Sequence, residues 1–311
     1  MIPSLESSDE YTPGGSRSEK YAARLLAWCG LALLIASPVW LLLTGHTSFR
    51  VSADTGRPPV SLWSAMLPAL VGLVLTRLVP PRMAVIEPLA GARRARVRGE
   101  MWVLVAMAVA FPVLLALLPP EVSRGAGYAV LKVVLFLVVP LAAFRSLRGT
   151  GPRPRAVSAR VPRARWWFPL PAVVAWFYLS QVSVLAPPPV AAESLPDPVT
   201  LAVVSVVTLL TAGVLEEFFY RGFLQTRLER LVGRWPAILV ASLLFAAMHL
   251  PTHLGSTAVI TELATVLVFQ GLFGVFCGYL WSRYRNIWMP VVVHILVNLA
   301  YVDLLLGWLG R

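Results

Sequence analysis

Apolar residues recur along this chain in runs long enough to cross a membrane, separated by short polar and basic tracts. A helix of about 20 apolar residues spans a hydrocarbon layer roughly 30 Å thick. Nine runs approach that length, at residues 22–45, 60–79, 100–118, 126–144, 167–186, 198–220, 236–250, 258–282 and 288–308. The pattern predicts an all-α, polytopic bundle of eight or nine transmembrane helices. It leaves open whether one weak segment is re-entrant.

The overall composition is that of a membrane protein. Hydrophobic residues make up 58% of the chain and charged residues 14%, whereas a soluble domain is about 25% charged. The mean hydropathy is +0.73. These values exclude an ordinary soluble domain.

The basic residues indicate how the chain is oriented. A net charge of +12 could suggest nucleic-acid binding, but these residues lie between the apolar runs. Arginines in such tracts fix topology and contact anionic lipid head groups. With a cytoplasmic N-terminus, 22 of the 27 Lys and Arg residues fall on the inner side. The other five are Arg50, Arg57, Arg124, Lys132 and Arg311. Lys132, near a helix end, is expected to extend to the outer surface. We expect membrane lipids as partners and no nucleic acid.

Polar segments divide the chain into three parts. Residues 1–21 are rich in Ser, Gly and charge, and are predicted to be a disordered cytoplasmic tail. Residues 22–186 hold N-terminal transmembrane helices to which the sequence assigns no role. Residues 198–308 form the candidate functional core. The two cysteines, Cys29 and Cys277, lie in separate apolar runs and are interpreted as small core residues without a disulfide.

Two adjacent carboxylates, Glu216 and Glu217, lie near the end of the sixth apolar run. A charged side chain in a spanning helix costs about 2.5–3.5 kcal/mol on insertion scales, so such residues are usually functional. Arg221 lies one turn after Glu217 and can neutralise it. Glu216 is then a carboxylate without a local partner and a candidate general base. The alternative is that both acids mark a helix end at the cytoplasmic interface.

Three further polar residues lie in the apolar runs that follow. His249 ends the seventh run, and His294 and Asn298 share one face of the ninth. A histidine on an apolar helix is more often a packing residue, and a His–Asn pair can simply hold helices together. His253 follows His249 by four residues, but Pro251 breaks the helix that a zinc-binding His pair of this kind needs.

Together these residues resemble the three motifs of the CPBP family, which comprises CAAX proteases, Abi proteins and bacteriocin-processing enzymes. Its best-known eukaryotic relatives are the type II CAAX prenyl endopeptidases. The matching positions are Glu216-Glu217-x-x-x-Arg221, Phe245-x-x-x-His249 and His294-x-x-x-Asn298. The surroundings also fit, in Tyr220-Arg221-Gly222, Gly274-x-x-x-Gly278 and Trp288-Met289-Pro290. The resemblance does not cover the N-terminal two-thirds of the chain.

The resemblance implies an intramembrane endopeptidase of the glutamic type, with residues 198–308 as its catalytic core. In such an enzyme Glu216 and His249 would activate a water molecule. His294 with Asn298 would hold the oxyanion of the tetrahedral intermediate. Amide hydrolysis needs a base for water and donors for the oxyanion, and this set supplies both.

The resemblance also gives supporting roles and a metal alternative. Glu217 and Arg221 would form the pair that orients Glu216. Enzymes of this family were long labelled metalloproteases, and Glu216, His249 and His294 would also be a zinc ligand set. No cofactor is expected, with zinc as the alternative.

These roles require a sixth helix that extends well beyond residue 220. If it ended at residue 220, Glu216 would lie near the inner surface, whereas His249 lies about 20 Å into the seventh helix at 1.5 Å per residue. The two could then not meet. We therefore predict that the sixth helix continues past Arg227 toward Leu231, with Gly233 as its stop.

The implied substrate is a membrane-associated peptide or protein, cut at a CAAX-like C-terminus, a leader peptide or a C-terminal sorting signal. The Ala- and Arg-rich composition is typical of bacteria and indicates a multi-pass protein of the bacterial inner membrane. The other hypothesis is a non-catalytic membrane scaffold or small-solute transporter that uses the same polar residues structurally. The oligomeric state stays open, because Gly274-x-x-x-Gly278 can dimerise helices or pack them within one bundle.

Overall fold

The computed structural model describes residues 16–50, 59–83, 89–119, 126–147, 163–188, 197–253 and 258–298. Over these ranges the chain is almost entirely helical, and its only sheet pairs β1 (Ser48–Phe49) with β2 (Val60–Ser61) in antiparallel fashion. Six helices of the described ranges are long and apolar enough to cross a membrane, and two shorter apolar helices accompany them. The predicted all-α membrane bundle is confirmed.

The N-terminal helices follow the predicted apolar runs. They are α1 (Arg17–Leu43), α2 (Leu62–Leu78), α3 (Arg94–Leu117), α5 (Ala126–Val133), η1 (Val134–Val138), α6 (Val139–Ser146), α7 (Ala164–Trp167), α8 (Leu170–Phe177) and η2 (Tyr178–Val182). α5, η1 and α6 form one continuous helix. The helix over residues 170–182 is about 20 Å long at 1.5 Å per residue, which is shorter than a hydrocarbon layer of roughly 30 Å.

Helix α1 begins earlier than the sequence suggested. Residues 1–15 of the predicted tail lie outside the described residues, but residues 17–21 already belong to α1. The cause is a capping box: the Glu19 backbone N–H donates to the Ser16 hydroxyl, and the Ser16 backbone N–H donates to the Glu19 carboxylate. Such a cap provides acceptors for backbone N–H groups that are otherwise unpaired at the start of a helix. The prediction of a disordered tail reaching residue 21 is therefore wrong.

The sixth helix is the longest in the described chain. It runs without a break through α9 (Pro198–Thr208), η4 (Leu209–Glu216), η5 (Phe218–Gln225) and α10 (Thr226–Val232). It stops at Gly233, whose φ of 90° a residue with a side chain rarely adopts. The prediction that this helix passes Arg227 and ends at Gly233 is confirmed.

The remaining helices complete the bundle. They are α11 (Arg234–Ala247), η6 (Leu250–Thr252), α12 (Val259–Val266), η7 (Leu267–Gly271), α13 (Leu272–Tyr284) and α14 (Trp288–Asn298). The predicted last run extended to residue 308, and residues 299–308 lie outside the described part of the chain.

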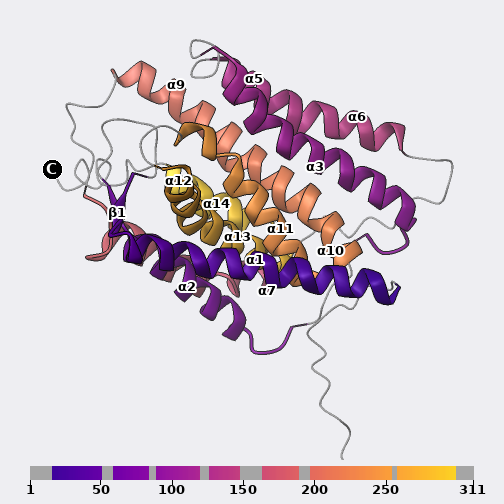
Figure 1. The fold of residues 1–311 in the computed structure, drawn as a ribbon, viewed down its shortest axis with the longest axis horizontal. Helices are drawn as coiled ribbons and strands as arrows, with labels where there is room; N and C mark the ends of the chain where they lie inside the picture. The colour runs from indigo at the N-terminus through magenta and orange to yellow at the C-terminus, as the bar shows by residue number, and fades with distance from the viewer. Residues whose placement is uncertain are drawn as a thin grey trace, which may run out of the picture.

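The C-terminal helices lie at the centre of the bundle. Figure 1 shows α3, α5 and α6 along one side and α1 and α2 along the other, with α11, α13 and α14 between them. α11 packs against α1, α3, α10 and α13, while α13 also packs against α2 and α14. The N-terminal helices thus form a shell around the segment that carries the candidate site.

Close packing inside this bundle explains the two spaced glycines. A Cβ at Gly274 would lie 3.0 Å from Ser242 Cβ of α11, and one at Gly278 would lie 2.8 Å from Gln225 Oε1. Both glycines are buried. Gly274-x-x-x-Gly278 therefore packs α13 against its neighbours within one chain.

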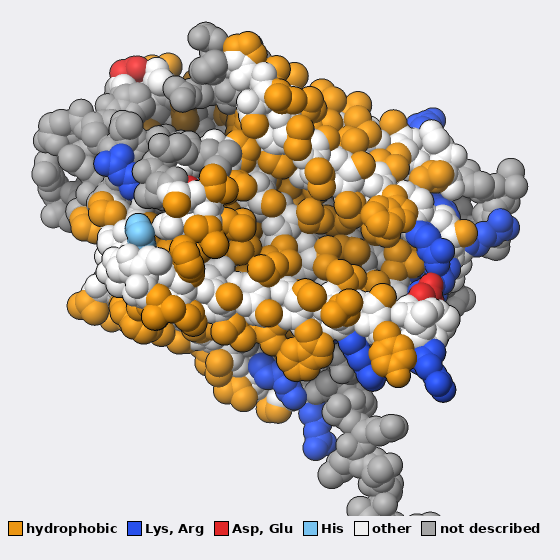
Figure 2. Space-filling model, in the orientation of Figure 1, with side chains coloured by type: hydrophobic (Ala, Val, Ile, Leu, Met, Phe, Trp, Pro, Cys, Tyr) orange, Lys and Arg blue, Asp and Glu red, His pale blue; other side chains and the backbone are white. Residues whose placement is uncertain are grey.

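The surface of the bundle suits a lipid environment. Figure 2 shows apolar side chains over the middle of the molecule and Lys and Arg gathered toward the end where α1 begins and α10 ends. Glu100 at that end accepts from Arg96 and Arg227 at 2.7 and 2.8 Å. The protein is thus a multi-pass membrane protein, and the cytoplasmic position of this end stays a prediction.

The two cysteines differ. Cys277 is fully buried, as predicted, but Cys29 is exposed on α1. Helix α1 buries only the face that packs on α11 and α12, and Cys29 lies off that face. The prediction of a core position is therefore wrong for Cys29.

Candidate active site

Glu216 and Glu217 lie near the middle of the continuous helix Val199–Val232. The backbone of η4 and η5 around them has π-helical turns, which are rare and occur frequently at functional sites. Both side chains are buried, at 1% and 0% exposure. A buried carboxylate is strongly unfavourable unless a cation or donors accompany it. The neighbours of the two acids therefore define the site.

Glu217 has two partners from different helices. Its Oε2 lies 3.2 Å from Arg221 Nε, as the spacing predicts. Its Oε1 accepts a hydrogen bond from His294 Nδ1 of α14 at 2.7 Å. Arg221 is itself fully buried, over the Phe245 ring at 4.7 Å. Glu217 thus joins the His294 ring to Arg221, and the expected role of Glu217 and Arg221 in orienting Glu216 stays a prediction.

The two carboxylate oxygens of Glu216 have different neighbours. Oε1 accepts a hydrogen bond from Lys132 Nζ of α5. Oε2 lies 3.8 Å from His294 Nε2, a distance longer than a hydrogen bond. Among the described residues Oε2 has no hydrogen-bond partner. One oxygen is therefore held by a cation while the other faces an imidazole.

His249 lies just beyond the end of α11. Its Nδ1 donates a hydrogen bond to the Phe245 carbonyl at 2.9 Å. In the neutral ring, Nε2 therefore carries the lone pair and can accept a proton. The rings of His249 and His294 both meet the Phe245 ring edge-on, with centroids 5.0 and 5.7 Å away. His249 also interacts electrostatically with Glu216. Both histidines thus converge on the Glu216 side of Phe245.

Asn298 is the last described residue of α14, one turn beyond His294, and it is partly buried. The structure therefore brings Glu216, Glu217, His249 and His294 into one cluster, with Asn298 on the adjoining turn. His253, which the sequence set aside, is buried near Glu262 of α12, with its Nδ1 4.0 Å from a carboxylate oxygen.

A glycine lets the acid-bearing helix approach α14. A Cβ at Gly213 would lie 2.5 Å from Ile295 Cγ1, closer than van der Waals contact allows. Ile295 directly follows His294. Any side chain at Gly213 therefore requires Ile295 to move, next to the histidine that faces both carboxylates.

We expect Gly213→Ala to destabilise the protein by about 1–3 kcal/mol through overpacking and to lower any activity of the site. Gly99→Ala in α3 is the matched control, because a Cβ there would meet Leu147 at an ordinary 3.6 Å and Ala favours helix over Gly. Thermal unfolding in detergent measures both variants. Equal stability of the two would contradict a tight helix contact at Gly213.

The comparisons with known proteins fall on this same region. Residues 198–300 match the family described as type II CAAX prenyl endopeptidase Rce1-like. This range contains Glu216, His249, His294 and Asn298. The C-terminal third is a CAAX-protease-like segment. No curated protein and no solved structure matches the chain.

The match supports a CAAX-type intramembrane protease role and confirms the family resemblance drawn from the motifs. It covers the long helix, α11, α13 and α14, which the structure packs together at the centre of the bundle. The helices before residue 198 lie outside the match. Their contacts with the matched segment indicate what they contribute.

One of those earlier helices reaches into the CAAX-protease-like segment. Lys132 was expected to extend to the outer surface, and this prediction is wrong: its side chain is 2% exposed and faces Glu216. The helix of Lys132 is held in place by η1, where Phe136 stacks on Phe219 with ring centroids 4.2 Å apart. One feature of the sequence indicated that a second cation is needed: Arg221 can neutralise only one of the two adjacent acids.

The side chains around Glu216 can be tested as a metal site. The Nδ1 hydrogen bonds of His294 and His249 leave both Nε2 atoms available as ligands, but Lys132 places an ammonium against Glu216. A cation next to a ligand carboxylate opposes metal binding by charge repulsion. Over the described residues, no group of three His, Cys, Asp or Glu side chains is arranged to hold a metal ion. The donor set does not fit zinc in this arrangement.

Proposed function

We propose that the protein is an intramembrane endopeptidase of the glutamic type, in which Glu216 is the general base. The observation that carries the proposal is the open Oε2 of Glu216, buried and 3.8 Å from His294 Nε2. A buried carboxylate oxygen beside two imidazoles provides a site for a water molecule and for a polarised carbonyl.

The proposed reaction is hydrolysis of an amide bond by water. Glu216 takes a proton from the water, assisted by His249, and the water oxygen bonds to the scissile carbonyl carbon. The resulting oxyanion accepts hydrogen bonds from Asn298 and from Nε2 of the doubly protonated His294 ring. Collapse of the intermediate breaks the C–N bond, and Glu216 returns its proton to the leaving amine.

The proposed chemistry uses no metal ion. Its support is the ammonium of Lys132 against Glu216, which takes the place that a metal would need. We further propose a membrane-associated peptide or protein as substrate, with a CAAX-like C-terminus, a leader peptide or a C-terminal sorting signal as the cleaved element. The family match favours the C-terminal element.

The test compares two histidines that lie four residues apart. We expect His249→Ala to lower the cleavage rate by about 10²–10⁴-fold, the usual contribution of an acid–base group. His253→Ala removes a histidine that the structure pairs with Glu262, and it should keep near-native activity. Cleavage of peptides with a CAAX, leader or sorting-signal element, in vesicles, is followed by mass spectrometry.

The same assay separates the alternatives. Cleavage should persist in the presence of a metal chelator, and loss of activity that added zinc restores would instead support the metal mechanism. No cleavage of any of the three peptide classes, or equal rates for both histidine variants, would favour the non-catalytic scaffold or transporter.

A further inference from the structure

Lys132 contacts Glu216 from a helix that lies outside the family match. It lies in α5, far from residues 198–300 in the sequence, and is 2% exposed. Its Nζ donates to Glu216 Oε1 and lies 4.4 Å from the Tyr128 ring centroid and 5.9 Å from that of Phe111. The ammonium is thus enclosed by one carboxylate and two aromatic rings.

With His249 and His294 neutral, the charges of the described residues at this site balance only if Lys132 is included. Glu216 and Glu217 are adjacent and both buried, so each needs a cation to remain ionised. Arg221 pairs with Glu217. Lys132 supplies the second cation, from a different part of the chain. Without it, the two carboxylates would share one cation in an apolar interior, where one of them would take up a proton.

Lys132 also determines which carboxylate oxygen of Glu216 is left without a hydrogen-bond partner. Because Nζ holds Oε1, the other oxygen is turned toward His294 at 3.8 Å. When Glu216 accepts a proton during turnover, the ammonium loses its ionic partner. The faces of Tyr128 and Phe111 can then stabilise its charge through cation–π contact. The arrangement therefore serves both protonation states of Glu216.

We propose that Lys132 is a positioning residue that keeps Glu216 ionised and presents its Oε2 to the reaction centre. This inference rests on the proposed function. The other titratable groups that interact with this pair are Tyr128 of α5, Tyr220 of the long helix, His249 after α11 and His294 of α14. The adjacent ion pair of Glu217 and Arg221 lies on the same long helix. Lys132 stays protonated throughout and exchanges no proton with the substrate.

The first test is the pH dependence of cleavage by Lys132→Met. Loss of the cation favours the protonated form of Glu216, so the acidic limb of kcat against pH should rise by about 1–3 pH units. Activity at neutral pH should fall at least about tenfold and recover at higher pH, with KM little changed. Lys20→Met, at the other lysine of the chain, exposed on α1, is the control and should leave the profile unchanged.

A second measurement does not depend on proteolysis. Infrared spectra at neutral pH should show the carbonyl stretch of a protonated carboxylic acid in Lys132→Met. The band should be absent from the wild type and should disappear when Glu216→Gln is added to Lys132→Met. It would be detected even if Lys132→Met were inactive at every pH.

The pH profile and the infrared spectra together distinguish the role of Lys132 from the proposed peptidase function. The infrared band together with a wild type that cleaves no peptide would support the role of Lys132 and contradict the proposed function. Absence of the band, with or without activity, would overturn the role of Lys132. So would an unchanged pH profile, or a variant more active than the wild type, which would make the ion pair inhibitory.

Discussion

Glu216→Gln is expected to lower the cleavage rate by about 10²–10⁴-fold, the range for removal of a positioned general base. The amide preserves the shape of the side chain but cannot take a proton from water. It also leaves the Lys132 ammonium without its carboxylate. An uncompensated buried charge costs about 3–5 kcal/mol, so this variant alone confounds loss of chemistry with loss of folding.

The double variant Glu216→Gln with Lys132→Met resolves this ambiguity. It removes both charges of the buried pair, which is often neutral for stability or even stabilising. We expect a thermal unfolding temperature close to that of the wild type and an activity as low as in Glu216→Gln. Stability comes from unfolding in detergent and activity from peptide cleavage in vesicles. A stable double variant that still cleaves peptide would exclude Glu216 as the base.

Arg221→Met is expected to destabilise the protein by about 3–5 kcal/mol, because Glu217 remains buried without its cation. Both side chains are 0% exposed and 3.2 Å apart, so water cannot compensate. Replacing both, as Glu217→Leu with Arg221→Met, should recover most of that stability. Activity should stay low, because His294 Nδ1 then loses the carboxylate that orients its ring.

The measurement is a double-mutant cycle of unfolding free energy and cleavage rate. The control pair is Glu19 and Arg98, which lie 3.1 Å apart and are largely exposed, and Arg98→Met should change stability by less than about 1 kcal/mol. If the Glu217–Arg221 double variant regained activity along with stability, the pair would be structural only, and the proposed role of His294 would lose its support.

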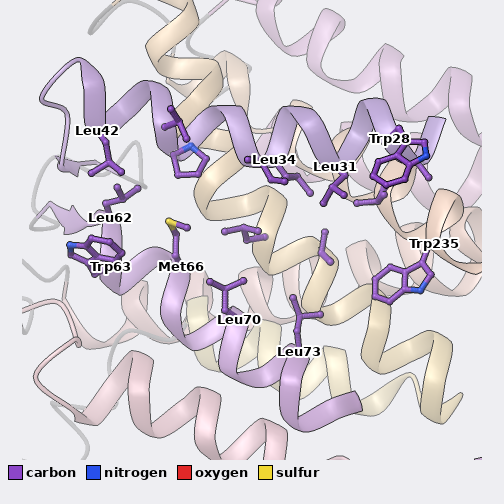
Figure 3. A pocket seen from close by; sticks show the side chains of 17 residues that line it. Trp28, Leu31, Leu34, Leu42, Leu62, Trp63, Met66, Leu70, Leu73 and Trp235 are labelled. Atoms are coloured by element: carbon purple, nitrogen blue, oxygen red, sulfur yellow. The ribbon is translucent and has the colours of Figure 1, made fainter. Parts of the chain in front are cut away.

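Figure 3 shows an apolar pocket in the bundle, away from the buried carboxylates. It lies between α1 and α2, above α11 and α13, and residues such as Leu31, Met66, Leu70 and Trp235 line it. No Lys, Arg, Asp or Glu of the described residues lines this pocket. The buried charges described above are instead concentrated around Glu216 and at the basic end of the helices.

Features whose cause lies within one helix were largely predictable from the sequence. Apolar run length predicted the helices, because a spanning segment must pair its backbone internally. The spacing of Glu217 and Arg221 predicted their ion pair. The helix that continues to Gly233 followed from the requirement that Glu216 reach His249. The cap at Ser16, which extends α1, was also visible in the sequence but was outweighed by the polar composition of the tail.

The sequence by itself determined a membrane bundle, the motif positions and the charge imbalance of two acids beside one arginine. Only the tertiary structure decided that Lys132 supplies the missing cation and that Glu217 holds His294. Helix periodicity fixes which residues share a face of one helix, but not which faces of distant helices meet. That choice depends on contacts such as Phe136 on Phe219 and Gly213 on Ile295, which join segments far apart along the chain.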